Sequence, residues 1–136
     1  MFGALPDGRP VERVLLRATN GFEARIITFG AALQALMVPD KNGRPDDVVL
    51  GHDEFKGYLD NRRFFGATVG RYANRIADAR FVLDGNAVQL TANNGKHALH
   101  GGPDGFDRKL WQITEIEDGA EPCVTLAYVS VDGEEG

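Results

Sequence analysis

The chain has very little cysteine, with one residue, Cys123, among 136. A single thiol cannot form an internal disulfide, so the fold has no covalent cross-link and a reducing compartment is expected. The neighbours Pro122 and Val124 favour a small core residue over a nucleophile at this position.

No segment has the features of a membrane helix or a secretory signal. The longest apolar run, from Phe29 to Val38, is interrupted by Gln34 and is shorter than the roughly 20 residues that span a bilayer. The N-terminus lacks the basic start, apolar run and small-residue cleavage site that mark exported proteins. We therefore expect a soluble, cytoplasmic protein with no membrane partner.

Positive charge is also scarce. Lys and Arg number 15 and Asp and Glu number 20, for a net charge of -5 and a pI near 5.1. Proteins that bind nucleic acid gain affinity by neutralising phosphates. The composition therefore argues against nucleic acid as a partner, although several arginines between residues 62 and 80 leave room for a local basic spot.

Glycine, by contrast, is abundant, with 17 residues in a chain of 136. This is nearly twice the usual share of about 7%, and the glycines follow no collagen-like period. Scattered glycines mark turns and bulges, which favours short strands over long helices. The length fits one domain, residues 1–136, rather than several.

Alternating apolar and polar residues predict strands along most of the chain. Val11–Ala18 and Phe22–Phe29 alternate on either side of Asn20–Gly21, a dipeptide typical of hairpin turns. Ala31–Val38 predicts a third strand, which ends at Pro39 because proline cannot continue the ladder.

Four further segments predict two more hairpins: Arg80–Leu83 with Asn86–Thr91, and Leu110–Glu117 with Cys123–Val131. Asp84–Gly85 is a second two-residue turn signature. Asp53–Leu59 is the exception, since an N-cap candidate, Asp53, precedes apolar residues at helical spacing and predicts one or two helical turns. The fold class expected is all-β, with eight or more short strands.

Residues 92–109 form a long irregular stretch rich in polar and turn residues. A loop of this length in a compact β domain is usually functional or disordered. Because Leu99, Phe106 and Trp111 can anchor it, we favour a functional loop. Phe106 and Trp111 are expected to pack beneath the loop rather than against a ligand.

Two histidines in this stretch, His97 and His100, leave several interpretations open. With Asp104 and Asp107 they could hold a metal, but flexible loop spacing makes a weak metal pattern, and no metal is expected. Proton transfer by one histidine near neutral pH fits better. A loop histidine that only bonds backbone groups is the remaining alternative.

Glycines 101, 102 and 105 beside His100 match neither the dinucleotide fingerprint nor the P-loop, so no nucleotide cofactor is expected. They do allow the backbone to approach a ligand or another strand closely.

The segment Gly66–Ile76 combines small residues with Arg71, Asn74 and Arg75 and resembles a buried stretch. A buried arginine must be paired or must face a polar cavity, because isolated charge burial is costly. Asn74 and Arg75 together offer donors suited to hydroxyls or a carboxylate. A salt bridge to an acidic residue is the alternative for the arginine.

At these segments the chain resembles the aldose 1-epimerase (galactose mutarotase) family. The matching motifs lie at Gly70–Ala77, Phe81–Gly85, Asn93–Gly95, Leu99–Gly102, Gly105–Asp107 and Leu110–Trp111. Weaker agreement extends over Phe29–Ala31, Val38–Asp40, Asp47–Gly51 and Asp132–Gly136. Ordered blocks at the expected separations make a chance match improbable.

The resemblance implies that the chain is part of a large antiparallel β-sandwich, the mutarotase supersandwich, with a cleft for a pyranose. It implies interconversion of the α and β anomers of an aldohexose such as glucose or galactose, without metal or organic cofactor. By position, Asn74 and Arg75 match the family's sugar-hydroxyl binders. His100 matches its first active-site histidine, which binds substrate and assists protonation, whereas His97 matches a variable surface position.

Length is the departure from the family. Members are well over twice as long, and the resemblance places their principal acid, a second histidine, and their base, a glutamate, beyond the point that matches Gly136. We therefore expect an N-terminal portion that is inactive alone and needs the missing C-terminal portion or self-association. The alternative is a non-catalytic or vestigial carbohydrate-binding module.

Overall fold

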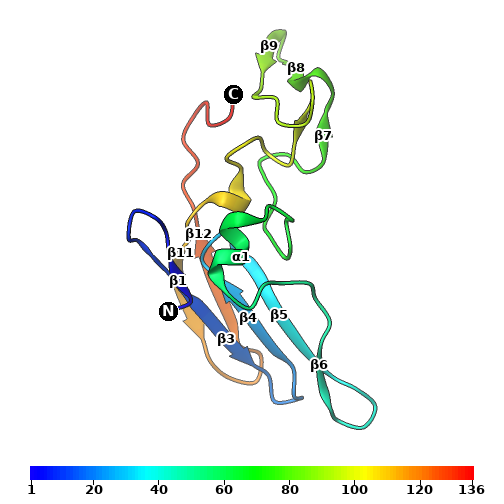
Figure 1. Ribbon diagram of the computed structural model, residues 1–136, viewed down its shortest axis with the longest axis vertical. Coiled ribbons are helices and arrows are strands. Elements are labelled where there is room, and N and C mark those ends of the chain that lie inside the picture. The colour runs from blue at the N-terminus through cyan, green and yellow to red at the C-terminus, as the bar shows by residue number, and fades with distance from the viewer.

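The computed structural model describes all 136 residues and is built almost entirely of strands (Figure 1). The elements are, in order, β1 (Gly3–Ala4), β2 (Pro10–Val11), β3 (Arg13–Arg17), β4 (Glu23–Ile27), β5 (Ala32–Pro39), β6 (Pro45–Asp47), α1 (Phe55–Asp60), β7 (Arg75–Ile76), η1 (Ala77–Ala79), β8 (Arg80–Leu83), β9 (Asn86–Gln89), β10 (Ala98–Leu99), η2 (Phe106–Arg108), β11 (Gln112–Glu117) and β12 (Cys123–Ala127). The predicted all-β class is confirmed.

The main sheet is antiparallel and has the strand order β3-β4-β5-β6. Its first hairpin forms at the predicted turn, where Gly21 has a φ of 87° and the side chain of Asn20 accepts the N–H of Phe22. β5 ends at Pro39, as predicted.

The hairpin of β8 and β9 also forms as predicted. Leu83 pairs with Asn86, which leaves Asp84 and Gly85 as a two-residue turn. Their φ values of 49° and 79° are both positive, as the hairpin turn that matches strand twist requires.

The core lies between the end of the main sheet and α1. Six apolar residues form it: Val11, Ile27, Phe29, Ala32, Phe55 and Tyr58. The ring of Phe29 meets that of Phe55 edge to face at 5.3 Å. The predicted cap was wrong, because Glu54, not Asp53, precedes the helix and makes no side-chain cap bond.

Cys123 is exposed, so its prediction as a core residue was wrong. It pairs with Glu117 next to the turn that joins β11 to β12. Side chains alternate along β12, and it is Val124 and Leu126 that turn inward there. The strand also ends at Ala127, earlier than predicted, and the chain continues without strand structure.

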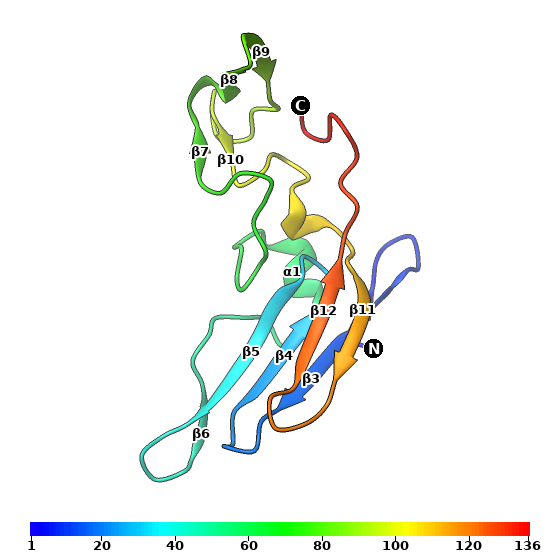
Figure 2. The same cartoon turned by 180° about the vertical axis from the view of Figure 1, so that it is seen from behind.

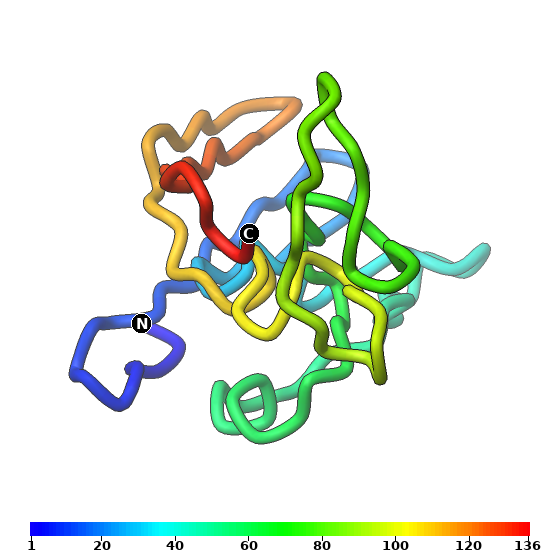
Figure 3. The backbone as a smooth tube through the Cα atoms, turned by 90° about the horizontal axis from the view of Figure 1, so that it is seen from above, coloured from blue at the N-terminus to red at the C-terminus, as the bar shows by residue number.

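The molecule is elongated, with the main sheet at one end and two small two-stranded sheets at the other (Figures 1 and 2). The smaller end carries β7 paired with β10 and β8 paired with β9. Seen from above, the C-terminal segment lies beside the chain near residue 100 (Figure 3). No helix has the length and apolar character needed to cross a membrane.

Burial is low for a chain of this length. Only 17 of 136 residues are buried, and large apolar side chains such as Leu50, Val82 and Val129 are more than half exposed. A domain of this size normally buries about two thirds of its unfolded surface. Several large apolar side chains are therefore left uncovered on this chain.

Candidate functional site

The site is built where β7 and β10 pair. In this antiparallel ladder Leu99 lies opposite Arg75, so the next residues on each side, His100 and Asn74, meet. The N–H of His100 donates to the carbonyl of Asn74 at 2.9 Å, and the N–H of Asn74 donates to Nδ1 of His100 at 3.0 Å. Two predicted site residues that are far apart in sequence are thus in direct contact.

Arg75 is held by two amides. Its Nε donates to Oδ1 of Asn94 at 3.0 Å, and its Nη1 donates to Oδ1 of Asn74 at 3.2 Å. Neither partner is charged and Arg75 is in no salt bridge, so the alternative of a structural ion pair is wrong. The guanidinium keeps its positive charge uncompensated, and Nη2 has no protein acceptor.

The expectation that Gly66–Ile76 is buried was also wrong, since Arg71, Asn74 and Arg75 are all exposed. The reason is that β7 lies in a two-stranded ladder with only β10 beside it. The donors of Asn74 and Arg75 are therefore accessible to a ligand.

The contact between Asn74 and His100 also determines the tautomer of the imidazole. A nitrogen that accepts a hydrogen bond carries no proton, so in neutral His100 the proton lies on Nε2. The ring therefore offers an N–H donor at Nε2. Such a donor suits a hydroxyl or an ether oxygen.

Both residues of this contact have a left-handed backbone, with φ values of 64° at Asn74 and 50° at His100. So does the neighbouring Phe64, with a φ of 58°. Side-chain-bearing residues rarely adopt this conformation, and each instance costs about 1–3 kcal/mol. Such residues cluster at binding and catalytic sites, where the surrounding structure holds them. Their convergence marks this region as a candidate site independently of side-chain chemistry.

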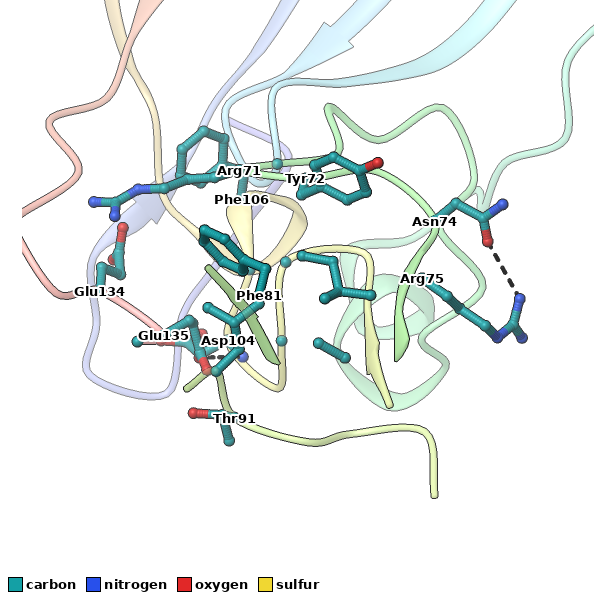
Figure 4. A pocket seen from close by; sticks show the side chains of 18 residues that line it. Arg71, Tyr72, Asn74, Arg75, Phe81, Thr91, Asp104, Phe106, Glu134 and Glu135 are labelled. Carbon is teal, nitrogen blue, oxygen red and sulfur yellow. Dashed lines mark hydrogen bonds between the residues drawn. The ribbon is translucent and has the colours of Figure 1, made fainter. Parts of the chain in front are cut away.

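A cavity of about 560 Å³ adjoins the site, within the usual range for small-molecule pockets. Asn74 and Arg75 line one part of it, while Asp104, Glu134 and Glu135 lie at another (Figure 4). His100 is not among the lining residues. Of the three residues that the resemblance assigns to sugar binding, Asn74 and Arg75 therefore line this cavity and His100 does not.

The glycines beside His100 permit close backbone approach, as predicted. A Cβ on Gly101 would lie 1.7 Å from the carbonyl oxygen of Gly70, and one on Gly102 would lie 2.5 Å from Oε2 of Glu135. The loop after β10 can therefore pack against both the segment before β7 and the end of the chain.

The end of the chain is joined to this loop by a polar network around Glu134. Lys109 bridges Asp104 and Glu134 at 2.6 and 2.9 Å, and Tyr128 donates to Glu134 at 2.5 Å. Burial raises the pKa of Glu134, but hydrogen bonds from Ser130, Tyr128 and Lys109 outweigh it and lower this pKa to about 2. Burial likewise opposes the charge of Lys109, yet the two carboxylates raise its pKa.

The aromatic residues of the loop pack against each other and against Tyr128. Phe106 meets Trp111 at 5.8 Å, and both meet Tyr128 at 5.7 Å. Trp111 donates its indole N–H to the carbonyl of Phe106. Phe106 also contributes to the cavity wall.

His97 lies apart from His100 in its bonding. Its Nδ1 accepts the N–H of Asp78 at 3.0 Å, and the residue is partly exposed. Asp104 bonds Lys109 and Asp107 bonds Arg62. The four residues weighed as a metal site are thus engaged separately, and no group of three or more His, Cys, Asp or Glu side chains converges anywhere in the chain.

Two residues of this site, Asn94 and Phe64, could not be identified as site residues from the sequence. Asn94 supports Arg75, and the only signal was its place in the matching segment Asn93–Gly95. The ring of Phe64 packs against that of His100, with the centroids 4.6 Å apart, and nothing in its local sequence singles Phe64 out. Long-range partners of this kind leave no periodic pattern.

The fold and site define an antiparallel β protein whose loops carry an exposed group of amide, guanidinium and imidazole side chains. The family model for aldose 1-epimerase matches residues 12–136. The chain belongs to the aldose 1-epimerase family.

Individual relatives agree with this assignment. The galactose mutarotase of Bos taurus is 45% identical over 136 residues, which is 100% of this chain and 39% of that protein. The aldose 1-epimerase of Escherichia coli (strain K12) is 39% identical over 131 residues, or 96% of this chain and 37% of that protein.

A solved structure agrees as well. The crystal structure of the GalM/aldose epimerase homologue from C. elegans matches with a TM-score of 0.84 and 34% identity, over 93% of this chain and 38% of that one. This chain spans about two fifths of the length of the curated relatives that it matches.

Proposed function

We propose that this chain is the sugar-binding N-terminal portion of an aldose 1-epimerase that interconverts the anomers of an aldohexose such as glucose or galactose. The observation that carries the proposal is the hydrogen-bonded group of Asn74, Arg75 and His100 beside a cavity of about 560 Å³. Amide, guanidinium and imidazole groups supply several donors and an acceptor, as the hydroxyls of a pyranose require.

The reaction needs one base and one acid. The base removes the proton of the anomeric hydroxyl while the acid protonates the ring oxygen, the ring opens, the carbonyl end rotates, and closure occurs on the other face. In this proposal Asn74 and Arg75 bind hydroxyls. His100 donates from Nε2 toward the sugar and assists protonation without being the principal acid.

The principal acid and base are proposed to lie in the portion of the family that this chain does not match. Each such group contributes about 10²–10⁴-fold to a rate, so residues 1–136 alone should bind sugar with little catalysis. The proposed partner is the missing C-terminal portion or a second copy, which would cover the exposed apolar faces. A cytoplasmic location and the lack of any cofactor stay predictions.

Polarimetry and binding measurements test the proposal together. Freshly dissolved α-galactose and α-glucose are followed by polarimetry with the chain present, and affinity is measured by NMR titration. We expect saturable binding without appreciable acceleration, and at least tenfold weaker binding for Arg75→Ala. Arg80→Ala, an exposed arginine with no side-chain bond, is the matched control.

Absence of binding to either hexose would overturn the assignment of a sugar site. Acceleration that depends on His100 would show that this chain is catalytic by itself and would contradict the placement of acid and base elsewhere. Binding that stays uncatalysed after the C-terminal portion of a relative is added would favour the vestigial module.

A further inference from the structure

The imidazole of His100 is held on two sides. The N–H of Asn74 bonds its Nδ1, and the tilted ring of Phe64 packs against it, with the ring centroids 4.6 Å apart and an interplanar angle of 51°. A hydrogen bond to one nitrogen still allows the ring to swing about that bond. The aromatic contact restricts this swing and so determines where Nε2 points.

Phe64 is itself anchored by Arg62. The guanidinium carbon of Arg62 lies 4.8 Å from the centroid of the Phe64 ring, in a cation–π contact. The same guanidinium donates from Nε and Nη2 to both carboxylate oxygens of Asp107, at 2.8 and 2.7 Å, and from Nη1 to the carbonyl of Pro103 at 2.7 Å. A planar guanidinium that donates to three acceptors in fixed positions has little freedom to move.

The anchor is buried at its far end. The side chain of Asp107 is 4% exposed and that of Arg62 is 25% exposed, and Asp107 lies in η2 on the loop that follows His100. The contacts therefore run as a closed chain from that loop through Arg62 and Phe64 back to the imidazole. Phe64 holds a left-handed backbone, with a φ of 58°, which the surrounding structure must maintain.

We propose that Phe64 and Arg62 are positioning residues, which hold the imidazole of His100 so that its Nε2–H is directed toward the bound hexose. The inference rests on the proposed function for the role of the sugar. The orientation of the ring is a separate property that can be measured without sugar.

The test uses the 136-residue chain labelled with ¹⁵N, and reads the imidazole of His100 by long-range ¹H–¹⁵N spectra and galactose affinity by titration. In the wild type we expect the Nε2–H tautomer of His100. We also expect the chemical shifts of its ring protons to be changed by the ring current of Phe64. Phe64→Leu should remove this ring-current shift and weaken galactose binding about three- to tenfold. Phe64→Tyr, which keeps an aromatic ring, should retain both the shift and the wild-type affinity.

Arg62→Lys keeps the phenyl ring of Phe64 but loses the two parallel hydrogen bonds from the guanidinium to Asp107. The His100 resonances should then shift part of the way toward their positions in Phe64→Leu. Arg62→Lys also serves as the test if Phe64→Leu does not fold. Phe65→Leu is the matched control, because this ring lies 5.5 Å from that of His52 and should leave His100 unchanged.

Unchanged His100 resonances in folded Phe64→Leu, or an equal change in Phe65→Leu, would overturn the positioning role. If the wild type shows the expected imidazole spectrum but binds no galactose, the positioning of the ring stands and the proposed function fails. Altered resonances with unaltered galactose affinity would overturn the link between ring position and sugar binding.

Discussion

The side-chain amide of Asn93 bonds both backbone groups of Leu99: its Oδ1 accepts the N–H at 2.7 Å and its Nδ2 donates to the carbonyl at 2.9 Å. Leu99 belongs to β10, the two-residue strand that brings His100 to Asn74. So short a strand has little stability of its own. The amide therefore takes the place of a neighbouring strand on the side of β10 that faces away from β7.

Replacing this amide tests its part in building the site. Asn93→Ala should destabilise the chain by about 1–3 kcal/mol, because it leaves two backbone groups without partners. Thermal unfolding measures the loss, and hydrogen exchange at the Leu99 amide localises it. Asn86→Ala, which removes a single 3.4 Å contact in an exposed turn, should cost less than about 0.5 kcal/mol. Unchanged protection of Leu99 would contradict this account.

His100→Asn separates the structural role of the imidazole from its role toward sugar. Asn tolerates the φ of 50° at this position, and its Oδ1 can replace Nδ1 as the acceptor for Asn74. We expect a stability change below about 1 kcal/mol but galactose binding about tenfold weaker, since the Nε2 donor is lost. Wild-type affinity in this variant would show that Nε2 does not contact the sugar.

Arg75→Lys tests the forked geometry of the guanidinium. An ammonium group on a flexible stem cannot reproduce the fixed bonds to Asn74 and Asn94. Because Arg75 is exposed, stability should change by less than about 0.5 kcal/mol, while hexose affinity measured by NMR titration falls about five- to tenfold. Arg80→Lys is the control, and an equal loss of affinity there would point to net charge rather than geometry.

Gly101 and Gly85 form a matched pair, with φ values of 83° and 79°. An added Cβ meets nothing within 4 Å at Gly85, whereas at Gly101 it would lie 1.7 Å from a backbone oxygen. Gly85→Ala should cost about 1–2 kcal/mol from backbone strain alone. Gly101→Ala should cost at least about 3 kcal/mol and abolish sugar binding; equal melting temperatures for the two variants would contradict the close approach to Gly70.

The network around Glu134 makes stability depend on acid pH. The folded-state pKa of Glu134 is lowered to about 2 from an ordinary value of 4.5, so its contribution is present above pH 4.5 and is lost as pH falls toward 2. Glu134→Gln should lower the free energy of unfolding by about 1–3 kcal/mol at neutral pH. It should also make the melting temperature less dependent on pH below pH 4.5. Glu115→Gln, an exposed residue on β11, should leave that profile unchanged, and a wild-type profile in Glu134→Gln would contradict the network.

Local patterns in the sequence were reliable where the structure depends on neighbours. Asp84–Gly85 formed its turn because both residues tolerate positive φ, and the alternation around Asn20–Gly21 produced the expected pair of strands. The same patterns failed for Cys123 because an alternating strand has two faces, and only the packing of the hairpin decides which one turns inward.

The amino-acid sequence by itself determined the all-β class, the two hairpin turns, and the choice of Asn74, Arg75 and His100 as candidate site residues. Only the tertiary structure decided that His100 accepts a hydrogen bond from Asn74, that Asn94 rather than a carboxylate holds Arg75, and that Phe64 packs against the imidazole. Turn and strand preferences act over a few residues, whereas these contacts join distant segments. Their geometry depends on the register of β7 against β10, which no local pattern encodes.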